Sequence, residues 1–446
     1  MNDLIKKDLK YLWHPYTQMK DCERMPPIPI KNAKGIKLFD HDGNFYYDTI
    51  SSWWCNVHGH NHPRINDAIT AQLKEFEHVL FAGFTHSGAV GLAERLVNIT
   101  PPNLSRVFYS DNGSTAVEVA MKMSFQYWLN RGVEGKTAFL SLDSAYHGDT
   151  IGAMSVSGVD LFNKKFCPLF FDSYKAKTPY CYRCPEGKDP ACCGIECFGS
   201  MRDILERHHD RIAAVILEPL LMGAGGMIVY PEEYLRKARE ITRKHDVHLI
   251  LDEVATGFGR TGSMFACERA GVEPDLMCLS KGITSGYLPI GVTLATEDIF
   301  RAFYADYGEH KTFYHGHTFT ANPLACAAAC ASIDLFGEEN TLDNVDSINS
   351  ALSSYLEKAS KRERVGDTRC IGSVGAMELV KDKASKERFG GDRRIGAEVY
   401  LKGLENNILL RPLGDVIYFF LPLSATPEEL DDIFLRTDIV LDSLNI

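Results

Sequence analysis

The stretch that decides the fold runs from Leu251 to Gly262 and reads LDEVATGFGRTG, and PDLMCLSKG follows it at Pro274 to Gly282. The residues before Asp252 are mostly apolar and partly β-branched, which predicts a buried parallel strand that ends at this acid. Open α/β sheets bind their ligands at the carboxyl ends of the strands. Lys281 closes the second apolar run, so an acid and a lysine are expected at strand ends. The pair suits pyridoxal phosphate, because the lysine can hold the aldehyde as a Schiff base and the acid keeps the pyridine nitrogen protonated.

A cofactor that carries a phosphate needs an anion-binding loop, and the chain has a candidate upstream. Val107 to Tyr109 is a short apolar strand, Ser110 to Ser114 reads SDNGS, and a helical pattern runs on from Thr115. Gly113 lets the backbone approach a phosphate closely, while Ser114, Thr115 and the free amides of the helix start can donate to it. The loop by itself also fits an ordinary helix N-cap. The lysine and the acid together favour the phosphate.

An aromatic residue follows the next predicted strand, Thr137 to Leu142, in the motif Tyr146-His147-Gly148-Asp149. The Tyr146 ring can stack on a planar pyridine, and stacked rings gain about 0.5–1.5 kcal/mol beyond simple burial. A core tyrosine with a satisfied hydroxyl is the alternative.

The motifs SDNGS, AYHGDT, LDEVATGFGRTG, LSKG and HGHTFTANPLACAA occur in this order, and with them the chain resembles the class III, or omega, aminotransferases of pyridoxal phosphate fold type I. The resemblance extends from about Leu12 to the end of the chain. It implies an α/β fold in which a large domain holds a mainly parallel seven-stranded sheet between helices, and both termini form a smaller α+β domain. It also implies a pyridoxal phosphate-dependent transaminase that works as a homodimer with shared active sites.

The resemblance assigns roles to single residues. Lys281 would bind the cofactor, Asp252 would pair with the pyridine nitrogen, and Tyr146 would stack on the ring. Gly113 and Ser114 would bind the phosphate. Gly316 and Thr318, in a Gly-x-Thr motif, would complete the phosphate site of the other subunit, and Gly316, Tyr146 and Lys281 would also contact the substrate.

Three further motifs resemble members of the family that aminate 8-amino-7-oxononanoate in biotin biosynthesis: LWHPYTQM at Leu12 to Met19, SSWW at Ser51 to Trp54, and RPLGDVIY at Arg411 to Tyr418. The resemblance implies that Tyr16, Trp53 and Arg411 bind this substrate. A long keto acid with a terminal carboxylate needs an apolar trough that ends in a cation, and the planar fork of an arginine matches a carboxylate with two bonds.

Two of these substrate residues, Arg411 and Trp53, also have a simpler explanation. Arg411 could be a strand-edge arginine, and Trp53 and Trp54 could both fill the core. Because successive strand residues face opposite ways, we expect one of the two tryptophans to face a pocket and the other the interior.

The amino donor stays open between S-adenosylmethionine and lysine. His317 stands in the Gly-x-Thr motif where the best-known members carry Pro, and Met222 stands where a Gln is usual in EPxxQGAGGM. Another omega-aminotransferase, which uses an amine or an omega-amino acid with pyruvate or 2-oxoglutarate, is the nearest alternative. An aminomutase or racemase of the same fold, or a non-enzymatic metal-binding or scaffold protein, would also have to be considered.

Composition limits the class of protein. The chain has 446 residues, of which 45% are hydrophobic and 24% charged, and its net charge is −11. Its length predicts a large domain and a smaller one. The alternation of predicted strands and helices places the large domain at 61–325 and the smaller one at 1–60 and 326–446. The acidic balance argues against nucleic acid, and no apolar run approaches the roughly 20 residues that span a bilayer. The N-terminus lacks a signal-peptide core, and 13 cysteines fit a reducing cytoplasm.

Coarser patterns predict several elements. Asp42-Gly43 within Gly35 to Tyr47 indicates a hairpin, Ala213 to Glu218 a buried strand, and Pro231 to His245 an amphipathic helix. The final PEELDDIFLRTDIVLDSL indicates a terminal helix.

One stretch is not absorbed by this account. Tyr180 to Cys197 reads YCYRCPEGKDPACCGIEC and holds five cysteines, at positions 181, 184, 192, 193 and 197. Such a cluster could bind zinc or an iron–sulfur centre. The predicted function needs no metal, so no metal site is assigned.

Overall fold

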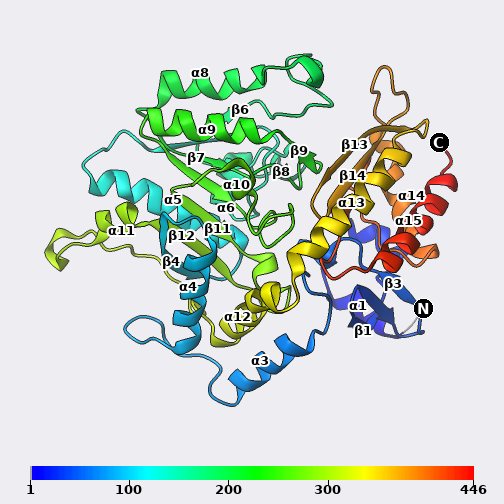
Figure 1. The fold of residues 1–446 in the computed structure, drawn as a ribbon, viewed down its shortest axis with the longest axis horizontal. Coiled ribbons are helices and arrows are strands. Elements are labelled where there is room, and N and C mark those ends of the chain that lie inside the picture. Colours follow the sequence, from blue (N-terminus) through cyan, green and yellow to red (C-terminus); the bar gives the residue numbers. More distant parts are fainter. Residues whose placement is uncertain (1–2) are drawn as a thin grey trace.

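A seven-stranded sheet forms the centre of the larger part of the protein, which we describe from a computed structural model covering residues 3–446 (Figure 1). The order of its strands is β4-β12-β11-β10-β7-β5-β6. All neighbours pair in parallel except β12, which is antiparallel to β11 and to β4. The predicted mainly parallel seven-stranded sheet is therefore confirmed. The strands are β4 (Leu104–Ser110), β5 (Ala138–Leu142), β6 (Tyr174–Ala176), β7 (Ile212–Leu217), β10 (His248–Asp252), β11 (Leu276–Leu279) and β12 (Gly291–Thr296).

Helices cover both faces of this sheet, so its central strands are apolar on both sides. All six residues of β7 are buried, and alternate residues enter different cores: Ile216 packs with α5, while Val215 and Leu217 join the main core. The helices are α3 (Pro63–Leu73), α4 (Ser87–Ile99), α5 (Gly113–Asn130), α6 (Ile151–Val156), α7 (Asp160–Asn163), α8 (Gly199–His208), α9 (Glu232–Lys244), α10 (Ala266–Ala270), α11 (Glu297–Phe303) and α12 (Pro323–Glu338). The predicted strand at 213–218 and helix at 231–245 agree with β7 and α9.

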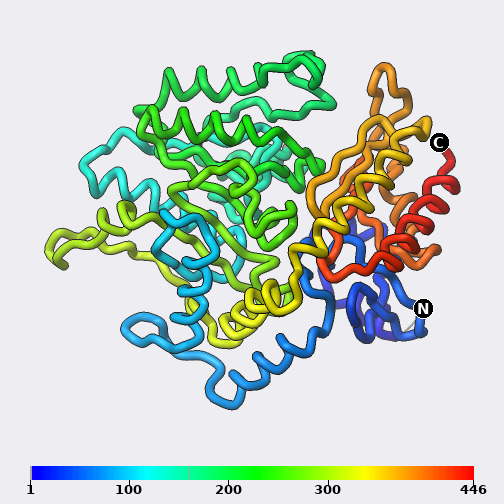
Figure 2. Tube along the Cα trace, in the orientation of Figure 1, coloured from blue at the N-terminus to red at the C-terminus, as the bar shows by residue number. Residues whose placement is uncertain are grey.

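The two ends of the chain share a second, smaller core. Ile36 and Tyr47 from the N-terminal part pack there with residues 348–444, and Figures 1 and 2 show the blue N-terminal segments beside the orange and red C-terminal ones. The elements are α1 (Asp3–Tyr11), β1 (Ile30–Lys34), β2 (Lys37–Asp40), β3 (Phe45–Tyr47), α13 (Thr341–Ala359), β13 (Val365–Ile371), β14 (Val374–Leu379), α14 (Ile395–Glu405), β15 (Val416–Phe420) and α15 (Pro427–Asp442). Helix α12 crosses position 325, so the domain ranges stay predictions.

Two local predictions had different outcomes. The hairpin at Asp42-Gly43 is confirmed, because β2 and β3 pair antiparallel around it. The strand geometry assumed for the two tryptophans is wrong: Ser51–Trp54 form the short, irregular helical turn α2. Ser51, Ser52 and Trp54 have positive φ values, from 51° to 67°. Trp53 is nevertheless 40% exposed and Trp54 only 4%, because the tight turn, rather than a pleat, sends the two rings apart.

Candidate active site

A cavity of about 590 Å³ opens where the central strands end. The segments after β4, β5, β7, β10 and β11 contribute to its wall, together with α2. Its lining includes Asn112, Gly113, Ser114, Tyr146, His147, Asp149, Glu218, Asp252 and Lys281. The lysine and acid of the sequence analysis therefore share one cavity with the loop and the tyrosine, as expected for ligand sites at the carboxyl ends of parallel strands.

Asp252 ends β10 and is held in place from two sides. His147 Nδ1 lies 2.8 Å from Asp252 Oδ2, and Asp252 Oδ1 accepts the Val254 N–H at 3.1 Å. Both the aspartate and the histidine are buried. Since an imidazole nitrogen that faces a carboxylate carries the proton, Nδ1–H is the donor. The sequence did not predict this contact, because His147 belongs to a motif that precedes Asp252 by about a hundred residues.

Lys281 follows β11 and has a φ of +46°, in the left-handed region. Strained backbone of this kind concentrates at functional sites. Its Nζ lies 4.6 Å from the centroid of the Trp54 ring. Burial lowers the pKa of Lys281, although the Asp252 and Glu218 carboxylates oppose the effect. A lowered pKa leaves more of the amine neutral, which is the form that attacks carbonyls and accepts protons.

The start of α5 forms the predicted anion-binding loop. Asn112 is its N-cap: its side chain accepts the Thr115 N–H at 3.1 Å, and the Thr115 hydroxyl accepts the Asn112 N–H at 2.9 Å. Thr115 is thus occupied by the cap, contrary to its expected part in binding a phosphate. Within residues 3–446 the amides of Gly113 and Ser114 have no hydrogen-bond partner. A Cβ on Gly113 would lie 2.7 Å from the Val254 side chain, so only glycine fits there.

The backbone of Tyr146 is fixed by a buried carboxyl group that was not singled out in the sequence. Glu218 Oε2 accepts the Tyr146 N–H at 3.0 Å, and Glu218 Oε1 accepts the Gly223 N–H at 2.9 Å. Burial raises the pKa of Glu218 to about 7, against the opposing effects of His147 and of these two amides. Glu218 thereby joins the backbone of Tyr146 to the chain segment after β7.

Tyr16 reaches this site from the N-terminal part of the chain. Its hydroxyl donates to Asp149 Oδ1 at 2.6 Å and lies 3.4 Å from the Tyr146 hydroxyl. Burial and the hydrogen bond to Asp149 raise the pKa of Tyr16 to about 12. The tyrosine is therefore a neutral hydrogen-bonding group at physiological pH.

A second cavity, of about 390 Å³, adjoins the first and is lined by Tyr16, Trp53, Tyr146, Lys281 and Arg411. The Arg411 guanidinium lies 4.6 Å from the centroid of the Trp53 ring, and the Tyr16 and Trp53 rings meet edge to face at 5.9 Å. The three residues that the resemblance assigns to the oxononanoate substrate therefore line one cavity together with Lys281.

Residues 18–440 match the family "Aminotransferase class-III". This chain is a class III aminotransferase. It is 50% identical over 425 residues to "Adenosylmethionine-8-amino-7-oxononanoate aminotransferase" of Geobacter sulfurreducens, covering 95% of this chain and 94% of the relative. The crystal structure of the enzyme with the same name from Methanocaldococcus jannaschii is 41% identical, with a TM-score of 0.94 and 99% of each chain covered. A pyridoxal phosphate-bound amine transaminase of an uncultivated Pseudomonas species is 33% identical, with a TM-score of 0.92 and coverage of 97% of this chain and 98% of that one.

Membership of the class III aminotransferases confirms the fold type and makes this protein a pyridoxal phosphate-dependent transaminase. The residues present fit the cofactor. An acid at a strand end faces the cavity, a lysine with a lowered pKa lines it, and a glycine loop with two unpaired amides opens a helix beside it.

Gly316 and Thr318 are the predicted site residues that the single chain does not bring to these two cavities. Both are exposed, in a loop that runs beside α5. His317 Nδ1 lies 2.6 Å from Asp111 Oδ2, and His315 Nδ1 lies 2.8 Å from Lys122 Nζ. Their role in the site of a second subunit stays a prediction.

The cysteine-rich stretch of this aminotransferase is an irregular segment between β6 and α8. Four of its cysteines, at 181, 184, 193 and 197, line one small cavity of about 20 Å³. Across residues 3–446 no group of three or more His, Cys, Asp or Glu side chains is placed to hold a metal ion. All thirteen cysteines are free thiols. In the same residues no helix is long and apolar enough to cross a membrane.

Proposed function

We propose that this class III aminotransferase moves an amino group from S-adenosylmethionine to 8-amino-7-oxononanoate, giving 7,8-diaminononanoate in biotin biosynthesis. The observation that carries the proposal is the convergence of Tyr16, Trp53 and Arg411 on a cavity that also holds Lys281. Relatives that are 50% and 45% identical carry the name of this activity. Aromatic rings would line the alkyl chain of the substrate, and Arg411 would bind its terminal carboxylate with two hydrogen bonds.

Each site residue has a task that follows from its surroundings. Bound pyridoxal phosphate supplies an aldehyde and an electron-accepting ring. Lys281 would hold the cofactor through its aldehyde, and its Nζ would carry the proton that moves during amino transfer. Asp252, oriented by the His147 Nδ1–H, would keep the ring nitrogen protonated. Tyr146 would cover one face of the ring.

The phosphate would be held at the start of α5. The Gly113 and Ser114 amides and the Ser114 hydroxyl are the donors available there, and the positive end of the helix dipole favours an anion. A phosphate held there would anchor the cofactor in the cavity that Lys281 also lines.

Ping-pong kinetics test the proposal. Donor and acceptor would use the same cavity in turn, so plots of reciprocal initial rates at several fixed concentrations of the other substrate should be parallel. Intersecting lines would show that both substrates bind together and would contradict the shuttle.

Donor choice needs its own experiment. Formation of the amino form of the cofactor should be followed by absorbance in single-turnover reactions with S-adenosylmethionine, lysine, and small amines. Conversion with S-adenosylmethionine alone supports the proposal, whereas conversion with lysine alone would reassign the donor. Neither His317 nor Met222 lines the two cavities of the single chain.

A second candidate is another omega-aminotransferase that pairs an amine with pyruvate or 2-oxoglutarate. Two solved omega transaminases support this candidate, because they are 30–31% identical to this chain and share its fold with TM-scores of 0.93–0.95. It would be favoured if 8-amino-7-oxononanoate failed to discharge the amino form of the enzyme while pyruvate succeeded.

We further propose a homodimer in the cytoplasm. The loop that carries Gly316 and Thr318 also exposes large apolar side chains of its own: Phe319 is 61% exposed and Tyr314 is 73% exposed. An apolar hollow of about 800 Å³, lined by α4, β4 and α11, lies in the same part of the fold. Burial of this surface by a second copy would bring the loop to the partner's site. Light scattering should give about twice the chain mass, and a monomer with full activity would contradict the shared site.

A further inference from the structure

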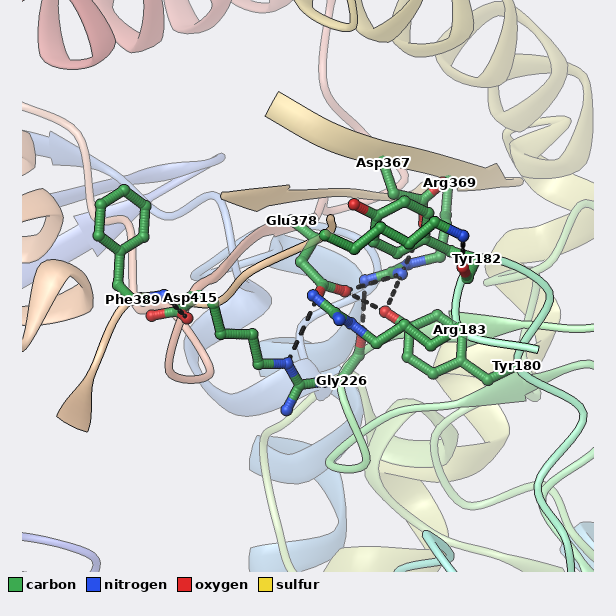
Figure 3. A network of polar contacts seen from close by, with 11 residues as sticks. Tyr180, Tyr182, Arg183, Gly226, Asp367, Arg369, Glu378, Phe389 and Asp415 are labelled. Atoms are coloured by element: carbon green, nitrogen blue, oxygen red, sulfur yellow. Dashed lines mark hydrogen bonds and ion pairs between the residues drawn. The ribbon is translucent and has the colours of Figure 1, made fainter. Parts of the chain in front are cut away.

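A buried polar network joins the cysteine-rich segment, the smaller domain and the backbone of Gly226 (Figure 3). At its centre is Glu378 on β14, which is 1% exposed. It accepts a hydrogen bond from Arg183 Nε at 2.7 Å, another from the Tyr180 hydroxyl, and one from Arg369 Nη1 at 3.4 Å. Burial raises the pKa of Glu378, but hydrogen bonds from Tyr180 and Arg183 outweigh it and hold the pKa below its ordinary value. The carboxyl group is therefore ionised.

Arg369 is the member of this network that reaches towards the active site. It lies on β13, and its side chain is 7% exposed. Its Nη1 donates to the Tyr180 hydroxyl at 2.6 Å and to Asp367 at 2.7 Å, while Nη2 donates to the Gly226 carbonyl oxygen at 3.0 Å. A charge-assisted hydrogen bond in a buried setting is about twice as strong as a neutral one. Arg369 thus ties a carbonyl of the large domain to the smaller domain.

Gly226 belongs to the turn between two short strands, β8 (Leu221–Met222) and β9 (Ile228–Val229). Its φ of +120° is open only to glycine. The N–H groups of Gly226 and Met227 both donate to the Gly223 carbonyl, at 3.1 and 2.8 Å, which closes the turn. A displacement of Gly226 would therefore also displace Gly223.

Gly223 in turn supports the ring beneath the reactive lysine. A Cβ at Gly223 would lie 3.0 Å from the Trp54 ring, so backbone and ring are in close contact. The Trp54 ring is the one that lies 4.6 Å from Lys281 Nζ. The negative face of an indole stabilises an ammonium ion, and the effect is larger where water is excluded. The position of the turn thus bears on the charge of Lys281.

We propose that Arg369 is a positioning residue for amino transfer: by holding Gly226 it fixes the β8–β9 turn, and through Gly223 and Trp54 it sets the position of the Lys281 amine. The inference rests on the proposed role of Lys281. It makes the smaller domain part of the cofactor site even though Arg369 does not line the cavity.

The test compares two arginines, Arg369 and Arg183, that donate hydrogen bonds to the same Glu378 carboxylate. Arg369→Met and Arg183→Met each remove a guanidinium from Glu378, but only the first releases Gly226. The readout is the pKa of Lys281 in the apoprotein, measured from the pH dependence of its acylation by a small reagent and quantified by mass spectrometry. Loss of the Trp54 contact in Arg369→Met should lower this pKa by about half a unit. Arg183→Met should lower the melting temperature without this change.

The holoenzymes supply a second readout. Arg369→Met should lower kcat about tenfold with KM changed less than about twofold, because the reacting amine is displaced while the substrate contacts remain. Arg369→Lys, which retains one donor for the Gly226 carbonyl, should recover most of this loss. Equal changes in the Arg369 and Arg183 variants, or no change in Lys281 acylation, would overturn the proposal.

Gly223→Ala keeps the experiment decisive if Arg369→Met does not fold. Its added methyl group would push the Trp54 ring while the polar network stays intact. The Lys281 pKa should fall as in Arg369→Met, and an unchanged acylation profile would overturn the proposal. The apoprotein measurement needs no substrate, so a failure to aminate 8-amino-7-oxononanoate would count against the proposed function alone.

Discussion

The two adjoining cavities are built in different ways. The cofactor cavity is the one that Asp252 and Lys281 line, and it is formed at the ends of strands in one sheet. Asp252 and His147 are only 5% and 3% exposed there. The substrate cavity is assembled from the N-terminal segment, the turn α2 and the stretch before β15, and Tyr16 and Trp53 are 48% and 40% exposed. If these residues act as we propose, the reacting groups lie in the buried interior, whereas the residues that select the substrate lie on accessible walls contributed by both ends of the chain.

This contrast has an energetic reason. Groups that change protonation must be held close together and away from water, which a buried sheet edge provides. A wall that admits and releases a long substrate cannot be closed in the same way. Substitutions in the first cavity should therefore remove activity, and substitutions in the second should mainly change KM.

The largest expected effect is the loss of turnover in Lys281→Ala, a change in the cofactor cavity. Turnover should fall by about 10⁴-fold or more, because both the covalent link and the proton carrier are lost. The variant should still bind pyridoxal phosphate, yet borohydride should no longer fix it to the protein, as measured by mass spectrometry. Lys175→Met is the matched control: burial lowers the pKa of Lys175 too, to about 7, but this lysine lies outside both cavities and its removal should preserve turnover. Full turnover by Lys281→Ala would remove the basis of the assignment.

Arg411→Met tests the substrate cavity. Loss of a charged, two-bond contact is expected to raise KM for 8-amino-7-oxononanoate by about 10- to 100-fold, since such bonds contribute about 1.5–3 kcal/mol. The half-reaction with the amino donor should change little. Arg362→Met, which loses surface ion pairs with Asp438 and Asp442, should leave the KM for 8-amino-7-oxononanoate and the half-reaction with the amino donor intact. An unchanged KM in Arg411→Met would favour the alternative omega-aminotransferase.

The smallest effect concerns pH and Glu218 in the wall of the first cavity. Burial raises the pKa of Glu218 to about 7, above its unfolded value, so the folded state prefers the protonated form. This group's contribution to stability is full below the unfolded pKa and is lost as pH rises through about 7. Glu218→Gln should therefore flatten the fall in melting temperature between about pH 4.5 and 7, by about 2 °C.

Glu253 gives the matched comparison for that measurement. Burial raises its pKa to about 7 too, but its carboxylate accepts the Ala266 and Cys267 amides at the start of α10 instead of lining the cavity. Glu253→Gln should change the pH profile of stability and leave cofactor affinity alone. Glu218→Gln should weaken cofactor binding as well, since Glu218 holds the Tyr146 backbone. Equal cofactor affinity in both variants would contradict that role.

The cofactor cavity was largely predictable because each of its parts is a local pattern. An apolar strand followed by Asp252, a run ending at Lys281 and a glycine turn before a helix are all visible within a few residues. The contacts that orient these parts could not be predicted from the sequence. Glu218 looks like any acid after a strand, and neither the contact of His147 with Asp252 nor that of Trp54 with Lys281 has a local signature.

The amino-acid sequence by itself determined the doubly covered sheet, the cofactor chemistry and the family, because strand periodicity and turn residues act over short distances. Only the tertiary structure decided that Tyr16, Trp53 and Arg411 share one pocket and that Arg369 holds the turn beside Trp54. Those contacts join residues up to several hundred positions apart, and such pairs meet only where the packing of whole elements brings them together.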